Sequence, residues 1–535
     1  MTRIIKWLLL SLALLLSPLL GKELNAQTIT AASCNASDVQ TALNSVSADG
    51  STVSIPAGTC HWSTIVTFSK AYSTTIQGQT IISGTCAPPS GACTATDNTI
   101  IYDDVNHGGS DPATLQLNTA AGKSLRLTGI SMLCDTANTS GPPYNGMIAV
   151  FGSSKLVRID HNDITFCITG GKGINLDGWL YGVVDHNLFN SSVSVTNDIE
   201  FQEPGWNGGS DPNGLGNASW TDIDYFGTGN FMFAENNLFT GGGWAYDCTA
   251  GGRYVFRYNL VGPHVKLQTH GLTSDAHRSC RNMEVYNNSL VFSSTPVSDN
   301  FAFLIELEGG TGLFWGNTVT GFVQFIHEDT VRTNNLTYSQ TAPPNGWGYC
   351  GTGVTGVTSA WDQNTNSAGY ACIDQVGRGK GDLLTGSSFP NIVDSVTNKV
   401  TSPNQALDPV YAWANTYNPV PQEGPDAYWS SADSAIVENR DYYLELPNYN
   451  EPSATFTGTV GIGQGLLSTR PSTCTPMVAY WATDQNTLYQ CQAGNTWTTY
   501  YTPFTYPHPL VSGSQTSGDP SGAPPAPTNL TVVVN

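Results

Sequence analysis

An asparagine-centred phrase recurs along the middle of this chain and sets the strongest limit on its fold. In each copy, an apolar residue precedes the Asn by three positions and a second apolar residue follows it by two. The copies centre on Asn162, Asn187, Asn237, Asn259, Asn288, Asn317, more weakly Asn335, and Asn415. A recurrence of about twenty to thirty residues is typical of a solenoid, because each unit buries its apolar face only against its neighbours.

The local pattern around each Asn predicts strands rather than helices. The units are short, rich in β-branched and aromatic residues, alternate with period two, and contain many Gly. Asn suits the bend between two strands, because it tolerates left-handed backbone geometry and its amide can hydrogen-bond the next coil. The sequence therefore predicts an all-β protein built as a parallel β-helix, also called a β-solenoid.

The ends and the charge indicate an exported protein that does not bind nucleic acid. Arg3 and Lys6 precede a short apolar run, which predicts a signal peptide over residues 1–26 rather than a membrane span. The formal net charge is -21, and nucleic-acid binding needs a broad basic face. We expect a secreted monomer, extracellular or on the cell surface.

The twelve cysteines are expected to form disulfides, since an exported chain meets an oxidising environment. Pairing of sequence neighbours is the simplest choice, although the sequence cannot prove connectivity. The competing interpretation, a structural zinc site, lacks a C-x-x-C pair. The neighbour pairs are Cys34–Cys60, Cys86–Cys93, Cys134–Cys167, Cys248–Cys280, Cys350–Cys372 and Cys474–Cys491.

The region before the repeats predicts a helix followed by a strand. The 3–4 apolar spacing after Asp38 predicts a short helix capped by Ser37 or Asp38, and a Pro-Ala-Gly turn closes the strand that ends near Gly58. The stretch from Asp38 to Trp62 resembles the opening of the pectate-lyase-like right-handed parallel β-helix superfamily. That resemblance implies a disulfide-stapled right-handed β-helix with an N-terminal cap helix.

The expected segments follow from this organisation. They are the N-terminal cap over 27–68, the β-helix over 69–420, C-terminal coils and cap over 421–511, and a Ser/Gly/Pro-rich linker and tail over 512–535. Residues 192–230 form an insertion rich in Trp and acids, predicted to be a long loop or one irregular coil. Its side chains suit a substrate lid, or packing and turns.

The residue two positions before each Asn should point outward, opposite to its apolar neighbours. This predicts a column along one face: Asp160, Asp185, Glu235, Arg257, Tyr286 and Trp315. Carboxylates in such a column can bind Ca²⁺, and we assign Asp160, Asp185 and Glu235 as its ligands with Asp247 in reserve. Cross-coil salt bridges such as Glu235–Arg257 are the structural alternative.

A basic island lies on this acidic chain between Arg253 and Arg281, and also holds Arg257, Lys266, His270 and Arg278. Such an island fits a site for a polyanionic sugar chain. Arg253 and Arg281 could instead pair with acids such as Asp247 and Glu284 to brace long turns. We assign substrate binding to Arg253, Lys266, Glu284, Tyr286 and Trp315, because Arg binds carboxylates and aromatic rings stack on sugar faces.

The resemblance implies a carbohydrate-active protein, and three activities remain open. The first is a polysaccharide lyase that cleaves a uronate-containing chain by β-elimination. A cation or Arg257 would then neutralise the uronate carboxylate, and His270, Arg278 or Arg281 would remove the C5 proton. The second is a glycoside hydrolase with a carboxylate pair such as Asp185 and Glu235. The third is a non-enzymatic adhesin or glycan-binding protein.

Overall fold

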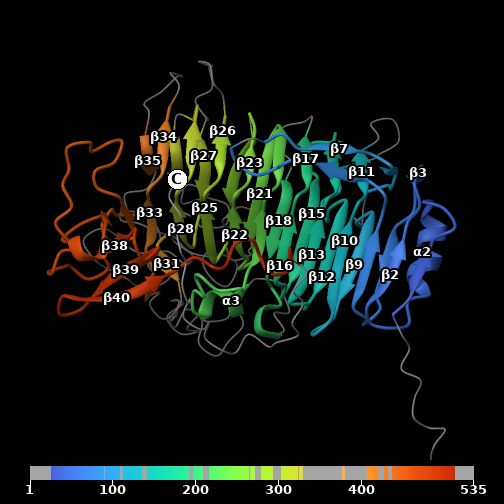
Figure 1. The fold of residues 1–535 in the computed structure, drawn as a ribbon, viewed down its shortest axis with the longest axis horizontal. Coiled ribbons are helices and arrows are strands. Elements are labelled where there is room, and N and C mark those ends of the chain that lie inside the picture. Colours follow the sequence, from blue (N-terminus) through green and yellow to red (C-terminus); the bar gives the residue numbers. More distant parts are fainter. Residues whose placement is uncertain are drawn as a thin grey trace, which may run out of the picture.

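Parallel strands stacked along one long axis form the body of the computed structural model (Figure 1). The structure describes residues 26–89, 91–108, 112–134, 141–191, 197–208, 216–263, 265–270, 279–292, 303–322, 324–328, 376–379, 406–419, 427–431 and 436–512. Among these residues, no helix is long and apolar enough to cross a membrane.

Three long sheets receive the strands in rotation, so that the chain passes through each sheet once per coil. Sheet A contains β1 (Thr28–Thr30), β2 (Ser51–Ser54), β5 (Thr74–Gln77), β10 (Ser124–Thr128), β13 (Leu156–Asp160), β16 (Gly182–Asp185), β19 (Met232–Glu235), β22 (Arg253–Arg257), β25 (Asn282–Tyr286), β28 (Thr311–Trp315), β33 (Val410–Trp413) and β36 (Tyr442–Leu444).

Sheet B contains β3 (Gly58–Trp62), β8 (Thr99–Asp103), β11 (Ser131–Cys134), β14 (Asp163–Phe166), β17 (Leu188–Ser191), β20 (Leu238–Gly241), β23 (Leu260–Val261), β26 (Ser289–Val291), β29 (Thr318–Thr320) and β34 (Thr416–Asn418). Sheet C contains β4 (Val66–Phe68), β9 (Leu115–Thr119), β12 (Ile148–Gly152), β15 (Lys172–Gly178), β18 (Asn197–Gln202), β21 (Gly243–Thr249), β24 (Val265–Thr269), β27 (Phe303–Leu307), β30 (Gln324–Glu328) and β35 (Ala427–Ser431). Their pairing is parallel throughout, which confirms the predicted long parallel sheets.

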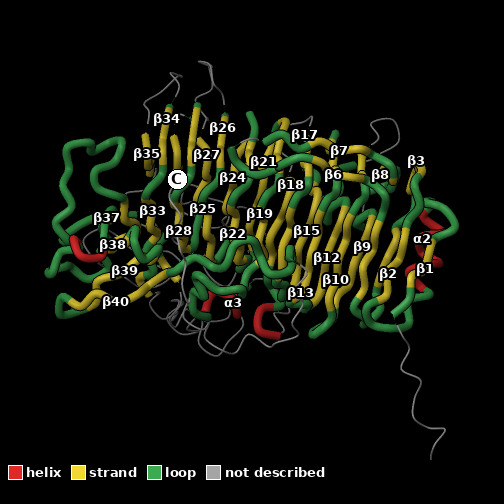
Figure 2. Tube along the Cα trace, viewed as in Figure 1, coloured by secondary structure: helices red, strands yellow, loops and turns green. Residues whose placement is uncertain are grey.

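Smaller elements surround the three sheets. They are helix α2 (Ala36–Asn44), the short helices η1 (Trp206–Gly208), α3 (Asn217–Thr221) and η2 (Leu467–Thr469), the antiparallel pairs β6 (Ile81–Ser83) with β7 (Thr94–Thr96) and β31 (Arg378–Gly379) with β32 (Ala406–Leu407), and a four-stranded sheet of β37 (Ile462–Gly465), β38 (Ala479–Ala482), β39 (Thr487–Gln492) and β40 (Thr496–Tyr501). Figure 2 shows how small the helical share is.

Helix α2 forms where its apolar spacing predicts, with Val39, Ala42 and Leu43 buried in the core. It lies at the N-terminal end of the stack (Figure 1). The predicted N-cap is wrong, because the helix begins two or three residues earlier with Asn35 at the N-cap position, and Asp38 lies in the first turn. A carboxylate there still interacts favourably with the positive end of the helix dipole.

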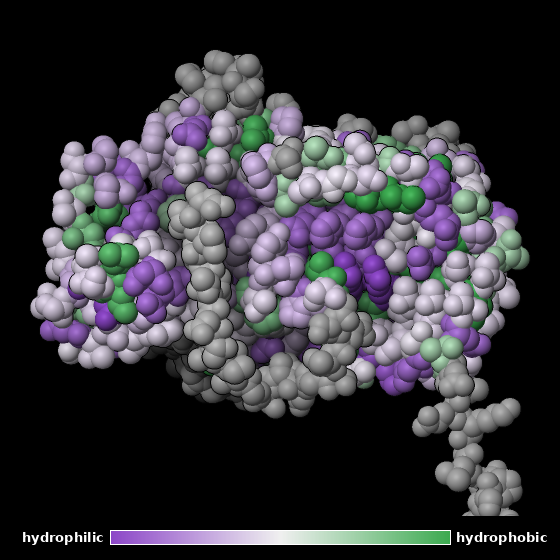
Figure 3. Space-filling model, viewed as in Figure 1, coloured by the Kyte–Doolittle hydropathy of each residue, from purple (hydrophilic) through white to green (hydrophobic). Residues whose placement is uncertain are grey.

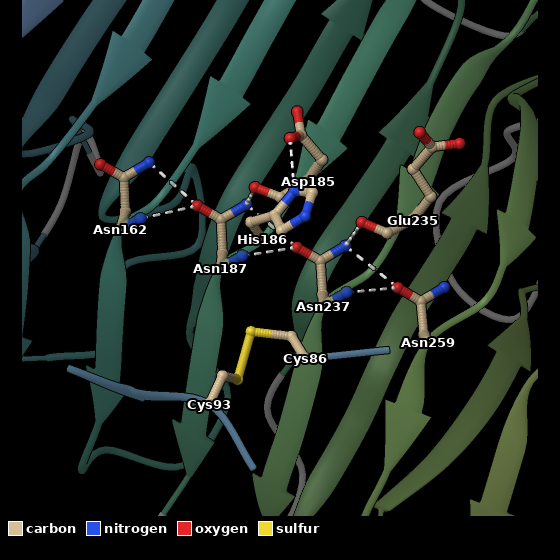
Figure 4. The surroundings of a disulfide bond; sticks show 9 residues. All are labelled: Cys86, Cys93, Asn162, Asp185, His186, Asn187, Glu235, Asn237 and Asn259. Carbon is tan, nitrogen blue, oxygen red and sulfur yellow. Dashed lines mark hydrogen bonds and ion pairs between the residues drawn. A yellow bond between two sulfur atoms is a disulfide. The ribbon is translucent and has the colours of Figure 1, made fainter. Parts of the chain in front are cut away.

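The Asn residues of the repeat form a continuous buried ladder at the corner between sheets A and B. Each side-chain amide donates to the Oδ1 atom of the next Asn, at 3.0 Å from Asn162 to Asn187 and again from Asn187 to Asn237 (Figure 4). The ladder continues through Asn259, Asn288, Asn317 and Asn415. Asn335 lies outside the described residues.

The left-handed position of this corner is the residue before the Asn, which corrects one part of the sequence interpretation. His161, His186 and Tyr258 have φ angles of 56°, 55° and 53°, and the following Asn carries the ladder instead. From β10 to β34 in sequence order, the A-to-B corner is always two residues long. The corner keeps one geometry because each ladder bond joins the same position of two successive coils and so fixes their register.

The apolar residues that flank each Asn are buried in the core, as predicted. Ile159, Ile164, Val184, Phe189, Phe256, Val261, Val285 and Leu290 are all inaccessible to solvent. Five of the predicted disulfides are present: Cys34–Cys60, Cys86–Cys93, Cys134–Cys167, Cys248–Cys280 and Cys474–Cys491. Cys350 and Cys372 lie outside the described residues.

Within the 192–230 segment, residues 197–208 and 216–230 are described, and they form an irregular coil, as one of the two interpretations predicted. It supplies β18 to sheet C, followed by η1 and α3. Trp206 and Trp220 from this segment are buried, and Trp220 Nε1 donates to the Ser279 carbonyl at 2.7 Å. These two side chains pack rather than line a surface. Asp211 lies outside the described residues.

Candidate functional site

The predicted column exists on sheet A. Asp160, Asp185, Glu235 and Arg257 occupy the same register position on consecutive strands β13, β16, β19 and β22. Tyr286 on β25 and Trp315 on β28 continue the line. The spacing of the Asn residues thus predicted correctly which side chains share one line on the sheet.

Each carboxylate of the column is bound by an arginine. Arg126 donates to both oxygens of Asp160 at 2.8 and 2.7 Å, and Arg158 does the same to Asp185 at 2.9 and 2.8 Å. Burial would raise the pKa of Asp160, but hydrogen bonds from Arg126 and His161 outweigh it and hold the pKa well below the usual 3.8. These are the cross-coil salt bridges of the structural alternative.

The arginine contacts leave little room for a cation at these carboxylates. Glu235 accepts from Arg257 Nε at 2.7 Å and from the His508 backbone N–H at 2.8 Å. Over the described ranges, no group of three His, Cys, Asp or Glu side chains is placed to hold a metal ion. The Ca²⁺ role of Asp160, Asp185, Glu235 and Asp247 stays a prediction that these contacts do not favour.

A segment from Tyr501 to Val511, here called the C-terminal strap, covers the middle of the column (Figure 1). Arg257 donates to the carbonyl oxygens of Phe504 and Thr505 at 2.8 and 2.9 Å. The ring of Tyr506 stacks on Tyr258 with centroids 3.7 Å apart. Arg257 is inaccessible to solvent, so its guanidinium anchors the strap and does not face a substrate.

The aromatic part of the column is also internal. Tyr286 and Trp315 stack with centroids 4.5 Å apart and are 1% and 7% exposed. Tyr286 accepts a hydrogen bond from Arg257 Nη1 at 2.8 Å. Trp315 donates to the hydroxyl of Tyr501 in the strap at 3.3 Å. A sugar platform here would require the strap to leave, so their substrate role stays a prediction.

Glu284 lies beneath the same strap and accepts hydrogen bonds from Tyr501 Oη and Gly227 N, both at 2.8 Å. Burial raises its pKa from 4.5 to about 7. The folded state therefore holds this proton more tightly than the unfolded chain. Stability from this residue is present below pH 4.5 and is lost as the pH rises through 7.

We expect Glu284→Gln to weaken the pH dependence of stability. Wild-type Tm should fall between pH 5 and pH 8 by about 2–4 °C more than the Tm of the variant, because only the wild type loses the Glu284 proton. Calorimetric melting across this pH range gives the comparison. Glu451→Gln, at an exposed position, serves as the control and should leave the wild-type slope unchanged. Identical slopes for wild type and Glu284→Gln would contradict the assignment.

The ends of the basic island brace the irregular coil. Arg253 donates to the Ser219 hydroxyl and to the carbonyl oxygen of Ile223, and its guanidinium lies 4.1 Å from the Trp206 ring centroid. Arg281 pairs with Asp224 at 2.7 Å and with Asp408 at 3.0 Å. Both arginines are inaccessible to solvent. The bracing alternative thus holds, although the acid partners differ from Asp247 and Glu284.

The other three candidate residues of the basic island lie in different parts of the chain. Arg278 lies outside the described residues. Lys266 and His270 belong to sheet C: Lys266 lies on β24, and His270 directly follows this strand. Along the strand Lys266, Gln268 and His270 alternate with the buried residues Val265, Leu267 and Thr269. The island therefore divides between an internal brace and the outer face of sheet C.

The outer face of sheet C carries a connected set of polar side chains on β15, β18 and β21. Lys172 Nζ lies 2.7 Å from Glu200 Oε2. Asn197 donates to Glu200 at 3.4 Å and to Asp247 at 3.0 Å, and Glu200 and Asp247 are register partners on β18 and β21. Charged groups of both signs thus meet on neighbouring strands of one sheet.

His270 joins this set through Asp247, with 3.2 Å between His270 Nδ1 and Asp247 Oδ2. Burial would lower the pKa of His270, but Asp247, Glu308 and Glu200 outweigh it and raise the pKa to about 10. About a third of the His270 side chain is exposed, so the pair reaches the surface. Asp247 also accepts from the backbone N–H of Cys248 at 2.7 Å, which fixes the carboxylate.

Asp177, at the end of β15, adds a second titratable group to this face. Burial and the negative charge of Glu200 raise its pKa from 3.8 to about 6, against the opposing effect of Lys172. Trp244 on β21 is half-buried and is the register partner of Lys266. The sheet C face therefore combines an imidazole–carboxylate pair, lysines, a carboxyl group with raised pKa, and an aromatic ring.

Sequence reasoning named Lys266, His270 and Asp247 but assigned no role to Lys172, Asp177 or Asn197. The Asn phrase fixes the register of sheet A, whereas the strands of sheet C follow corners of variable length. Period-two alternation within β15, β18 and β21 was the available signal. It identifies outward side chains strand by strand, but it does not align one strand with the next.

Comparison with known proteins finds similarity only among solved structures. No protein-family model matches the chain, and no curated protein matches it. An alginate lyase from Paenibacillus sp. str. FPU-7 aligns with a TM-score of 0.30 and 16% identity, over 55% of this chain and 95% of the lyase. ORF18 of Geobacillus virus E2 aligns with a TM-score of 0.21 and 11% identity, over 88% and 86% of the two chains. A functional assignment must therefore rest on the residues of this chain.

Proposed function

We propose that this protein is carbohydrate-active, and that it acts as a lyase on a uronate-containing polysaccharide at the outer face of sheet C. The observation that carries this proposal is the contact between His270 and Asp247, with Glu200 as the register partner of Asp247. A histidine held by a carboxylate is a common arrangement for a general base. The superfamily resemblance of the N-terminal stretch agrees with a carbohydrate ligand, but it does not choose among lyase, hydrolase and binding protein.

In the proposed reaction, neutral His270 accepts the C5 proton of a uronate through Nε2. The electron pair of the C5–H bond forms the C4–C5 double bond, and the C4–O bond to the neighbouring sugar breaks. The departing oxygen takes up a proton from the imidazolium or from water. Asp247 orients the ring and stabilises the imidazolium, and it does not touch the substrate. Arg257 is covered by the strap, so we assign neutralisation of the uronate carboxylate to a cationic group next to His270 on the sheet C face.

Hydrolysis is the second reaction that a specific observation favours. Asp177 has a raised pKa and lies close enough to Glu200 to feel its charge, while Lys172 binds Glu200. A carboxyl group with a raised pKa can serve as the acid of a glycosidase beside a second carboxylate. This pair replaces Asp185 and Glu235, which are bound by arginines.

One assay separates the two reactions. Purified protein is incubated with acidic and neutral polysaccharides while ultraviolet absorbance of the unsaturated product and new reducing ends are followed together. We expect both signals on a uronate polymer, and loss of both in His270→Gln. Reducing ends without absorbance, abolished by Asp177→Asn, would assign hydrolysis. Binding without either signal across the panel would overturn both reactions and leave the glycan-binding alternative.

A further inference from the structure

A groove of about 240 Å³ lies beside the N-terminal end of the sheet A column, outside the part that the strap covers. One wall is polar and comes from β5, β10 and the corner after β13. The other wall is apolar and comes from the β6–β7 hairpin. Lining side chains include Gln77, Arg126, Thr128, His161, Ile81 and Ile82. Figure 3 shows a hydrophilic area bordered by apolar residues on this face of the molecule.

Two equivalent arginines on neighbouring coils differ in what they bind. Arg126 and Arg158 are register partners. Each forms a bidentate salt bridge with a carboxylate on the following coil, Arg126 with Asp160 and Arg158 with Asp185. The remaining nitrogen of Arg158, Nη1, donates to the strap carbonyl oxygens of Leu510 and Val511 at 3.1 and 3.4 Å. The same nitrogen of Arg126 has no hydrogen-bond partner among the described residues, and 40% of this side chain is exposed.

Two histidines extend the polar wall beyond Arg126. His161 and His186 stack in parallel with centroids 5.1 Å apart. Each directs Nδ1 at the preceding aspartate, His161 to Asp160 and His186 to Asp185, both at 2.8 Å. The Nε2 edge of each ring therefore faces away from the aspartate. Side-chain exposure is 38% for His161 and 30% for His186, so both edges are accessible.

We propose that this groove is a second binding site, distinct from sheet C, for an oxyanion carried on a sugar chain. Arg126 Nη1 would bind a carboxylate or sulfate oxygen, as Arg158 Nη1 binds the strap carbonyls. Ile81, 54% exposed, would contact the apolar face of a sugar ring. Asp160 binds only Nε and Nη2 of Arg126, so Nη1 can still donate to an anion. The site should therefore prefer an anionic sugar over a neutral one.

Calorimetric titration of the full chain in a His270→Gln background tests the site without turnover. The probes are a galacturonate hexamer, a sulfated oligosaccharide of similar length and a neutral glucose hexamer. With both sites present, we expect two equivalents of an acidic probe to bind. Adding Arg126→Gln should remove one equivalent or raise its Kd at least tenfold, a loss typical for one charged contact. Binding of only one acidic probe would identify carboxylate or sulfate as the ligand group.

A matched control and a second variant keep the test decisive. Lys70→Gln removes one positive charge from another exposed position and should leave both equivalents intact. Gln77→Trp fills the groove without changing the charge and should act like Arg126→Gln. If the sheet C face binds no probe, the His270→Gln protein should bind one equivalent of an acidic probe, and the same protein with Arg126→Gln added should bind none. Unchanged stoichiometry and Kd in both groove variants, or equal binding of the neutral hexamer, would overturn the proposal.

Discussion

Asn237→Leu is expected to lower the free energy of unfolding by about 3–5 kcal/mol, because it interrupts the ladder at its centre. Asn237 Oδ1 accepts from the backbone N–H and the amide of Asn187, both at 3.0 Å. Its own amide donates to the Val184 carbonyl at 2.9 Å and to Asn259 Oδ1 at 3.1 Å. Leucine satisfies none of these, so buried polar groups on the two neighbouring coils lose a partner in a place that water does not reach.

Asn190→Leu is the matched control, since Asn190 has an exposed side chain on the neighbouring strand β17. We expect its effect to stay within about 0.5 kcal/mol. Denaturant titration of both variants against wild type measures the difference. An Asn237→Leu midpoint close to that of Asn190→Leu would show that the ladder contributes little beyond its geometry.

The second large effect concerns the pH dependence of the proposed lyase. With a His270 pKa of about 10, only a small fraction of the ring is neutral near pH 7, so kcat/KM should rise with pH until His270 has lost its proton. His270→Gln should lower kcat/KM by about 10²–10⁴-fold, the usual contribution of a general base. Initial rates on the uronate polymer across the alkaline range measure both effects.

Asp247→Asn separates the positioning role of Asp247 from direct catalysis. Removing the carboxylate removes the leading cause of the raised His270 pKa, so the rising limb of the profile should move toward neutral pH while the maximal rate falls. His61 and Asp104, paired at 2.9 Å near the N-terminal end, provide the matched controls His61→Gln and Asp104→Asn. A profile that does not move in Asp247→Asn would contradict the assignment of its rising limb to His270.

The sequence predicted the frame of this fold better than its site. The Asn phrase placed the core residues, the outward column and the ladder, because those features repeat at one corner with one geometry. It could not show that the strap covers Arg257, since the contact from Arg257 to Phe504 joins residues 247 positions apart. The sequence also did not predict the pairing of Arg126 with Asp160, because Arg126 precedes the first recognisable copy of the repeat.

The site was partly accessible to sequence reasoning. Charge clustering drew attention to the stretch that contains Lys266 and His270, but clustering along the chain does not distinguish an internal brace from a surface. Arg253 is the first residue of β22 and Arg281 directly precedes β25, and the irregular coil contacts both arginines. The burial of these arginines depends on the irregular coil within residues 192–230, and the sequence of that coil has no periodic pattern that would predict its fold.

The constant two-residue corner between sheets A and B has a consequence for how such a chain can diversify. From β10 to β34, changes of loop length fall at the other two corners. Between sheets B and C, five residues separate Phe166 from Lys172 but one separates Gly241 from Gly243, and between sheets C and A the chain lengthens from Gln202 to Met232. Those two corners border sheet C along both of its edges. Loops can therefore be exchanged around one working face while the ladder keeps the coils in step. An engineer could graft new loops there, as on an antibody scaffold, without redesigning the frame.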